Sequence, residues 1–400
     1  MKYTVLLFLS LGIASGFPGM DTLLNDIKRR QSTDERSEMI GDLTDGATTA
    51  VGRQVRECIT NVGSCENQEE KSYNRPGNLG TALCRADSCC VWDFIQEELV
   101  ELFLNEDGTC NSLARASVRL GFHDAGAWSK DSGPGGADGS LLLSPDEINR
   151  PENNGLQEVR TRALQLLDKY SRHDVTAADL VQFMHNVATV TCPLGPRLLT
   201  LVGRRDRREA NPTGLIPNNN ATDATFLIEL FQNKTFTARD LGALLGAHTV
   251  ARQSFVDRSR AGQPLDSTPG VWDMNFYLEM AMPEPPSGVF RLASDEALSL
   301  ADGTSSRFTA FTDTTFGQTV WNTDYSVAYV RLSLLGVNNI NRLTDCTKVL
   351  PNSVTSFSLR SSSPSTPATS STPSSAAELS STESRNMMLC GLLCIFILMI

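Results

Sequence analysis

Two polar side chains, Arg119 and His123, stand four residues apart in an otherwise apolar segment. If the segment is helical, both lie on one face, where a guanidinium and an imidazole can handle charge and protons together. Oxygen-bearing residues and a glycine follow the histidine closely: Asp124, Gly136, Asp138 and Ser140. Oxygen ligands of this kind suit a hard cation such as calcium. We therefore predict a catalytic site with a cation bound directly behind it.

A helix has to position this pair. Asn111 and Ser112 are good helix-starting residues, and apolar residues follow at helical spacing. A second helix is expected at 241–252, after a start at Thr237 and Asp240 that resembles a capping box.

The second helix places His248 on a stripe with leucines. A lone histidine on an apolar face is more often a core residue than a ligand, so both interpretations stay open. Downstream, the segment 265–273 holds Asp266, Thr268 and Asp273, which could wrap a calcium ion or simply form a turn.

Composition bounds the function. The 400 residues carry a formal net charge of -11, which argues against nucleic-acid binding and supplies no polybasic membrane patch. Ten cysteines are typical of an exported protein. Helical patterns at 91–103, 156–170, 175–190 and 222–231 predict a mainly α fold without internal repeats.

Both ends of the chain carry targeting signals. Residues 1–16 have the pattern of a signal peptide, and 17–83 form a polar extension, interpreted as a pro-segment or a flexible arm. Residues 353–386 form a Ser/Thr/Pro-rich stalk, and small residues at 374–377 precede an apolar tail at 387–400. This end favours a GPI attachment signal over a tail-anchor helix or a disordered end. Asn220 and Asn233 begin glycosylation sequons.

Several motifs together carry a resemblance to a known family. They are RLGFHDAG, GGADGS, ENNGLQEV, DVTAADL, GAHTVAR, LDSTPGVWD, FRLASD and LTDC. In this order, and across residues 84–352, they resemble the fungal secretory haem peroxidases, class II of the plant-type superfamily. Phe122 beside His123 is what the secretory classes carry.

The resemblance implies two helical layers that sandwich one b-type haem per chain. His248 would be the axial iron ligand, with Asp295 accepting a hydrogen bond from its other ring nitrogen. His123 would transfer the proton of the peroxide, and Arg119 would stabilise developing negative charge, through a ferryl intermediate. Asn153 would orient His123, and Glu147 would connect this network to the distal side.

The resemblance also implies two calcium ions and a set of disulfides. The distal ligands would be Asp124, Gly136, Asp138 and Ser140. The proximal ligands would be Thr249, Asp266, Thr268, Val271 and Asp273. The family pairings are Cys84–Cys90, Cys89–Cys346 and Cys110–Cys192, and Cys58–Cys65 is expected to close a small loop in the extension.

Departures from the family bear on substrate. The positions of the manganese-binding carboxylates hold Ser112, Ala116 and Ser254, and the position of the radical-forming tryptophan holds Ala243. The expected donors for H2O2 reduction are therefore small phenols or other aromatic molecules at the haem edge. We expect a secreted monomer, attached to membrane or wall by the GPI anchor, that binds no nucleic acid.

A surface-anchored wall-interaction module that has lost turnover is the alternative to an enzyme, but it has no need for a buried Arg and His pair. A hydrolase lacks a nucleophile elbow. His173 and His185 are expected to have no special role. Packing is the expected role of all four tryptophans: Trp92, Trp128, Trp272 and Trp321.

Overall fold

The computed structural model describes residues 38–217 and 221–358. The predicted signal peptide and GPI tail, the stalk from residue 359 onward, the start of the extension and Asn220 lie outside these residues. The described chain is mainly α, as predicted, with one two-stranded antiparallel sheet of β1 (Leu201–Val202) and β2 (Thr344–Asp345). Within the described ranges, no helix is both long and apolar enough to cross a membrane.

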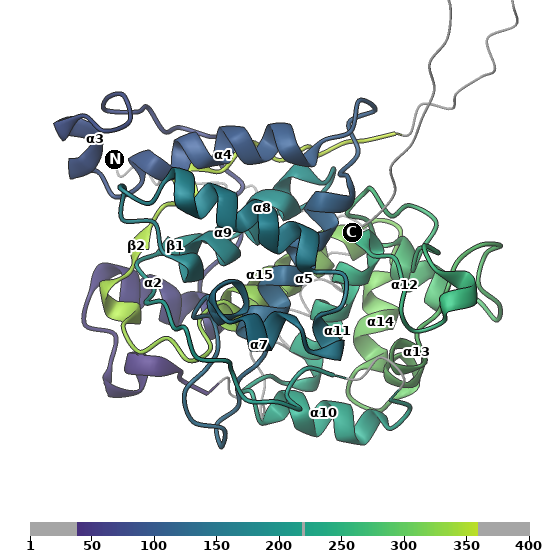
Figure 1. The fold of residues 1–400 in the computed structure, drawn as a ribbon. Coiled ribbons are helices and arrows are strands. Elements are labelled where there is room, and N and C mark those ends of the chain that lie inside the picture. The colour runs from purple at the N-terminus through teal and green to yellow at the C-terminus, as the bar shows by residue number, and fades with distance from the viewer. Residues whose placement is uncertain (1–37, 218–220, 359–400) are drawn as a thin grey trace, which may run out of the picture. The chain divides into compact units, whose positions relative to one another are not determined.

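The first group of helices surrounds the segment that carries Arg119 and His123. Helix α5 packs along α9, and α9 also contacts α4 and α8; Figure 1 shows α4, α8 and α9 side by side. The members of this group are α3 (Ala82–Ala86), α4 (Cys90–Phe103), α5 (Ser112–Ala125), α6 (Ser140–Leu143), α7 (Pro145–Ile148), η2 (Pro151–Asn153), α8 (Gln157–Lys169) and α9 (Ala177–Thr191).

The second group surrounds His248. Helix α11 packs against α15 and α14, and α12 contacts the turn that carries the histidine. The members are α10 (Ala224–Gln232), α11 (Ala238–Leu245), η3 (Gly246–Val250), η4 (Arg258–Arg260), α12 (Asn275–Met280), α13 (Ala293–Leu300), α14 (Ser305–Phe311) and α15 (Gly317–Leu332). The short helices η5 (Ile340–Arg342) and η6 (Thr347–Val349) flank β2.

Residues 38–83 differ from the expected flexible arm. They form η1 (Gly41–Asp45), α2 (Ala50–Ile59) and only the first two residues of α3, and α2 packs against α15 and η5. Val55 and Ile59 are fully buried, and Arg331 of α15 donates to the carbonyl oxygens of Glu38 and Ile59. The interpretation as a flexible arm is therefore wrong for 38–83. The helical periodicity of α2 is hard to detect in the sequence because the helix is short and its few apolar residues stand among charged ones.

The helix around His248 also differs in its bounds. The expected helix 241–252 begins earlier, at Ala238, behind the predicted capping box of Thr237 and Asp240. It gives way at Gly246 to a 3-10 turn that ends at Val250. The turn passes close to Trp321, because a Cβ on Gly246 would lie 2.3 Å from the indole ring. His248 therefore stands on a 3-10 turn and not in the α-helix.

All four expected disulfides are present. They are Cys58–Cys65, Cys84–Cys90, Cys89–Cys346 and Cys110–Cys192. Cys89–Cys346 joins the start of α4 to the end of the folded chain, across 257 residues of sequence. Cys110–Cys192 joins the residue before the α5 N-cap to the end of α9, so it ties together the two helices at the site.

Candidate active site

Helix α5 presents Arg119 and His123 as the sequence predicts. Asn111 caps the helix, because its side-chain oxygen accepts hydrogen bonds from the backbone N–H groups of Leu113 and Ala114 at 2.9 and 3.1 Å. The 14 residues of α5 then run without interruption through His123. Four residues separate the two functional side chains, which puts them on one helix face.

The imidazole of His123 has a fixed tautomer. Its Nδ1 lies 2.8 Å from Oδ1 of Asn153, whose Nδ2 donates to the carbonyl oxygen of Glu147 at 2.7 Å. The amide N–H of Asn153 donates to Glu147, so the amide oxygen of Asn153 faces His123. Nδ1 of His123 therefore carries the proton. The lone pair of Nε2 is left available, which makes this nitrogen the candidate base.

Arg119 is held by backbone carbonyl groups. Its two terminal nitrogens donate to the carbonyl oxygens of Asn154 at 2.8 Å and Glu152 at 2.7 Å. Burial lowers the pKa of the guanidinium to about 10, so it remains charged at neutral pH. Since both acceptors are uncharged, this positive charge stays available to stabilise an anion.

His248 has the opposite kind of partner. Its Nδ1 lies 2.7 Å from Oδ2 of Asp295, the third residue of α13. The Asp295 side chain is 1 % exposed, whereas the His248 side chain is 31 % exposed. The carboxylate therefore fixes the proton on Nδ1 and leaves Nε2 on the open edge of the ring, where it can bind a metal.

The two imidazoles differ in protonation. Burial, followed by the positive charge of Arg119, lowers the pKa of His123 well below its usual value, against the hydrogen bond to Asn153. Burial also lowers the pKa of His248, but the charge and hydrogen bond of Asp295 outweigh it and raise that pKa overall. The positive charge of Arg119 lowers the pKa of both rings.

The expected distal calcium ligands surround the end of α5. Asp124 is fully buried, and its two carboxylate oxygens accept from the backbone N–H groups of Gly139 and Leu141. Within the described residues, Asp138 Oδ2 and Ser140 Oγ are buried without a hydrogen-bond partner. Burial and the neighbouring charge of Asp138 raise the pKa of Asp124 well above its usual value. Buried oxygens with unused lone pairs fit a hard cation.

The backbone of this loop requires glycine at two positions. Gly136 has φ +101°, and a Cβ there would lie 2.1 Å from the carbonyl oxygen of Leu335. Gly139 has φ +73°, and a Cβ would lie 2.5 Å from the backbone nitrogen of Ala178. The loop therefore packs closely against α9 and against the turn that follows α15. These contacts fix the positions of Asp138 and Ser140.

The expected proximal calcium ligands also gather in one place. The hydroxyl of Thr249 lies near Oδ2 of Asp266, the carbonyl oxygen of Val271 at 3.3 Å and Oδ1 of Asp273 at 3.5 Å. Thr268 lies 3.1 Å from the same Asp273 oxygen. One hydroxyl proton cannot satisfy three acceptors, so this cluster has surplus oxygen lone pairs.

The charge state of the proximal cluster also fits a cation. Burial raises the pKa of Asp266 to about 8 and that of Asp273 to about 6. In the described part of the chain, no three His, Cys, Asp or Glu side chains form a metal-binding group. Each candidate calcium cluster has two carboxylates, completed by hydroxyl and carbonyl oxygens, which is a donor set that calcium accepts.

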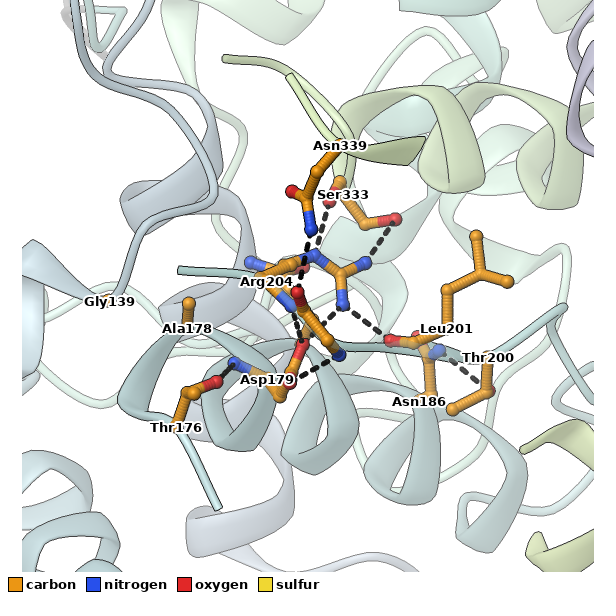
Figure 2. Close-up of polar contacts among 12 residues, drawn as sticks. Gly139, Thr176, Ala178, Asp179, Asn186, Thr200, Leu201, Arg204, Ser333 and Asn339 are labelled. Atoms are coloured by element: carbon orange, nitrogen blue, oxygen red, sulfur yellow. Dashed lines mark hydrogen bonds and ion pairs between the residues drawn. The ribbon is translucent and has the colours of Figure 1, made fainter. Parts of the chain in front are cut away.

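The residues that hold the distal loop from behind are not predicted from the sequence. Arg204 and Asp179 form a buried ion pair at 3.0 Å, and Arg204 also donates to the carbonyl oxygen of Ser333 (Figure 2). The side chain of Asp206, two residues after Arg204, accepts a hydrogen bond from the backbone N–H of Ala178. The N–H of Arg207 in turn donates to the carbonyl oxygen of Asp138. Asp179 lies in the DVTAADL motif, and this motif is the feature of the sequence that could have identified it.

Asn211 is a second residue that was missed. Its N–H donates to Oε2 of Glu147 at 2.9 Å, and its Nδ2 lies 3.4 Å from both the Gly136 carbonyl oxygen and Asp138 Oδ1. Asn211 therefore joins Glu147 to the candidate calcium loop. Its position in an Asn-Pro turn gives no hint of this role. Burial raises the pKa of Glu147, against the hydrogen bond from Asn211.

The remaining predicted residues fall in ordinary surroundings. Phe122 stacks on Phe231 at 6.3 Å and meets His123 edge-on at 5.7 Å. Trp92, Trp272 and Trp321 are buried, as expected for packing residues, and Trp128 is half-buried.

Comparison with known proteins agrees with this geometry. The peroxidase family model matches residues 95–314. The chain is 32 % identical to a peroxidase from Arthromyces ramosus over 305 residues, which cover 71 % of this chain and 80 % of that protein. It is 33 % identical to ligninase C of Trametes versicolor, over 69 % of this chain and 78 % of the relative. It is 32 % identical to manganese peroxidase H4 of Phanerodontia chrysosporium, over 68 % of this chain and 76 % of that relative. The chain therefore belongs to the peroxidase family and is a haem peroxidase with the mainly α, plant-type fold.

Proposed function

We propose that this protein is an extracellular peroxidase that reduces hydrogen peroxide and oxidises small phenols or similar aromatic donors. The observation that carries the proposal is the pairing of two different histidines at one site. His123 has a neutral partner and a free Nε2, and His248 has a carboxylate partner and an open ring edge.

The chain's own residues account for binding and proton transfer. Nε2 of His248 would hold the iron of one b-type haem, and Asp295 would keep the proton on the opposite ring nitrogen. When bound, the haem supplies the electrons that cleave the peroxide O–O bond and later recovers them from the donor. Two calcium ions would fix the loops behind the histidines, with the ligands described above.

His123 would carry one proton between two oxygen atoms. Its neutral Nε2 would take a proton from one oxygen of the peroxide and return it to the other, departing oxygen, which leaves as water. Asn153 keeps Nε2 unprotonated in the resting site by fixing the proton on Nδ1. The guanidinium of Arg119 stabilises the negative charge that develops on the departing oxygen.

Substrate and location complete the proposal. Ser112, Ala116 and Ser254 offer no carboxylate for manganese, and Ala243 is buried and carries no aromatic ring. Direct transfer from small aromatic donors is therefore the proposed route. The four disulfides favour an oxidising compartment. A monomer attached to membrane or wall by a GPI anchor is the proposed mature form, because the tail at 387–400 has that sequence pattern.

The absorption spectrum of the purified protein tests the function. With haem bound, stoichiometric hydrogen peroxide should bleach and shift the Soret band, and a phenol should restore it. Manganese(II) and a non-phenolic aromatic alcohol should restore it far more slowly. A haem-loaded protein that ignores peroxide would favour the inactive wall-interaction module. Release by a phosphatidylinositol-specific phospholipase tests the anchor.

A further inference from the structure

A buried tyrosine and a buried histidine lie next to each other outside the set of residues assigned to the peroxide chemistry, with His185 packed behind Gly121 of α5. His185 of α9 is fully buried, and Tyr325 of α15 is 1 % exposed. Nε2 of His185 lies 2.9 Å from the Tyr325 hydroxyl. Neither residue contributes to the proposed peroxide chemistry, so their pairing needs its own explanation.

Neighbouring hydrogen bonds fix the direction of the proton between them. The Thr200 hydroxyl donates to the Leu198 carbonyl oxygen, so it accepts from Nδ2 of Asn186 at 2.9 Å. Asn186 therefore turns its Oδ1 toward Nδ1 of His185, at 3.0 Å, and Nδ1 must carry the hydrogen. Nε2 then has only a lone pair, so the Tyr325 hydroxyl donates to it.

The protonation states agree with this direction. Burial lowers the pKa of His185 to about 3, although the hydrogen bond to Asn186 opposes the change, so the imidazole is neutral. Burial raises the pKa of Tyr325 well above its usual value, so the phenol keeps its proton. A phenol hydrogen-bonded to a neutral imidazole can lose an electron without leaving a buried phenol cation, because the proton can shift to Nε2.

Aromatic rings in contact with one another connect Tyr325 to the turn that carries His248. Trp321 packs against Gly246, two residues before His248, and its Nε1 donates to the Ala243 carbonyl oxygen at 3.0 Å. Its ring lies 6.2 Å from that of Tyr325. Trp272 stacks parallel to Trp321 at 5.1 Å and meets Tyr325 edge-on at 4.7 Å. Rings in contact at these separations allow rapid electron transfer.

Tyr329 provides a matched neighbour without a base. Its ring stacks on both Tyr325 at 5.8 Å and His185 at 3.3 Å, and it is equally buried. Its hydroxyl, however, donates to the amide oxygen of Gln182 at 2.8 Å. An amide oxygen is a far weaker base than an imidazole, so oxidation of Tyr329 has no comparable proton acceptor.

We propose that Tyr325 and His185 form an internal radical site that stores an oxidising equivalent when no donor is present. The inference rests on the proposed function, because hydrogen peroxide supplies the oxidant at the haem. An electron leaves Tyr325 through Trp321 to the oxidised haem site, and the hydroxyl proton moves to His185 Nε2. The products are a neutral tyrosyl radical and an imidazolium. Re-reduction by a donor electron returns the proton to the phenol.

Electron paramagnetic resonance of the holoprotein tests this. The protein is mixed with stoichiometric peroxide without donor and frozen, with ring-deuterated tyrosine to identify a tyrosyl signal. The wild type should show the signal. Tyr325→Phe should lose it and Tyr329→Phe should keep it, with the resting Soret band and circular dichroism unchanged in both. His185→Gln should also lose it although Tyr325 remains.

The outcomes separate the radical site from the proposed function. If peroxide is consumed but the tyrosyl signal is absent or persists in Tyr325→Phe, the radical site is wrong and the peroxidase proposal stands. If peroxide is not consumed, protein loaded with zinc porphyrin is illuminated with a cobalt(III) ammine acceptor, which creates an oxidant in the same pocket without peroxide. A signal that requires Tyr325 under those conditions supports the radical site, and its absence overturns it.

Discussion

The two histidines of the site present the same ring with different partners behind it. His123 has the amide of Asn153, and its pKa is lowered, so it stays a neutral base. His248 has the carboxylate of Asp295, which raises its pKa; sharing of the Nδ1 proton with that carboxylate would give the ring anionic character. In the proposed mechanism, this exchange of an amide for a carboxylate is what separates the proton carrier from the metal ligand.

The largest effects should come from removing each ring. His123→Ala should slow peroxide cleavage by about 10²–10⁴-fold and leave haem content unchanged, because only the proton carrier is lost. His248→Ala should lower the haem content instead. Stopped-flow absorbance with peroxide and the haem-to-protein ratio after gel filtration measure the two properties. His173→Ala, in a half-buried turn, is the control. Equal loss of both properties in both variants would contradict the comparison.

Replacing the amide behind His123 with a carboxylate should give His123 the raised pKa that His248 has. In the wild type, the lowered pKa of His123 keeps its base form as pH falls, so the peroxide reaction should continue below about pH 6.5. Asn153→Asp places a carboxylate against Nδ1 and should raise that pKa. The variant should therefore lose rate as pH falls through the raised value. A pH–rate profile measures this, with Asn154→Asp as the control for added charge. Identical profiles for wild type and Asn153→Asp would refute the assignment.

The reciprocal substitution, which removes the carboxylate behind His248, should have a somewhat smaller effect. Asp295→Asn keeps a hydrogen-bonding side chain behind His248 but removes its charge, so the pKa of His248 should fall. Partners of this kind are worth about 10–100-fold in metal affinity or activity. The haem reduction potential should rise, since the ring becomes a weaker donor to ferric iron. Spectroelectrochemistry measures the potential, and Glu296→Gln, on the same helix, is the control. An unchanged potential would count against an anionic His248.

Removal of calcium should affect the loops behind both rings. A chelator should lower the melting temperature, and calcium at about 100 times its Kd should restore about 2.7 kcal/mol. Without calcium, folding raises the pKa of Asp273 to about 6 and of Asp266 to about 8. The folded state then binds more protons than the unfolded state, so stability should fall as pH rises through this range.

Thermal denaturation at about pH 5 and about pH 8, with and without chelator, measures that dependence. Calcium should flatten it, because the bound cation favours the ionised carboxylates at every pH in the range. Magnesium is the control cation, since it prefers tighter octahedral sites. Chelator-treated protein with an unchanged melting temperature and haem spectrum would rule out both calcium sites.

The smallest effects should come from the helix caps that precede the two rings. Asn111→Ala before α5 and Thr237→Ala before α11 should each lower the free energy of unfolding by about 1 kcal/mol. Asn111→Ala should cost more, because Asn111 also donates to the Leu102 carbonyl oxygen. Urea denaturation measures both, with exposed Ser112→Ala as the control. No loss in either variant would show that tertiary packing alone holds these helices.

Much of the site could be predicted from sequence because its information is local. The spacing of Arg119 and His123, the cap at Asn111 and the capping box at Thr237 each depend on residues within one or two helical turns. The eight motifs kept their order along the chain, so the family fold and the pairing of the cysteines could be expected as well. The three family pairings are present in the structure, and so is the local Cys58–Cys65 loop that was predicted separately.

Only the tertiary structure decided the contacts between distant segments. Tyr325 and His185 are separated by 140 residues, and Arg331 reaches Glu38 across 293. Neither pair carries a local pattern, since none of the four residues stands out within its own segment of the sequence. The extension 38–83 appeared polar because only a few side chains, such as Val55 and Ile59, enter the core. Burial and partner choice depend on which helices pack together, and packing assembles groups that spacing along the chain cannot relate.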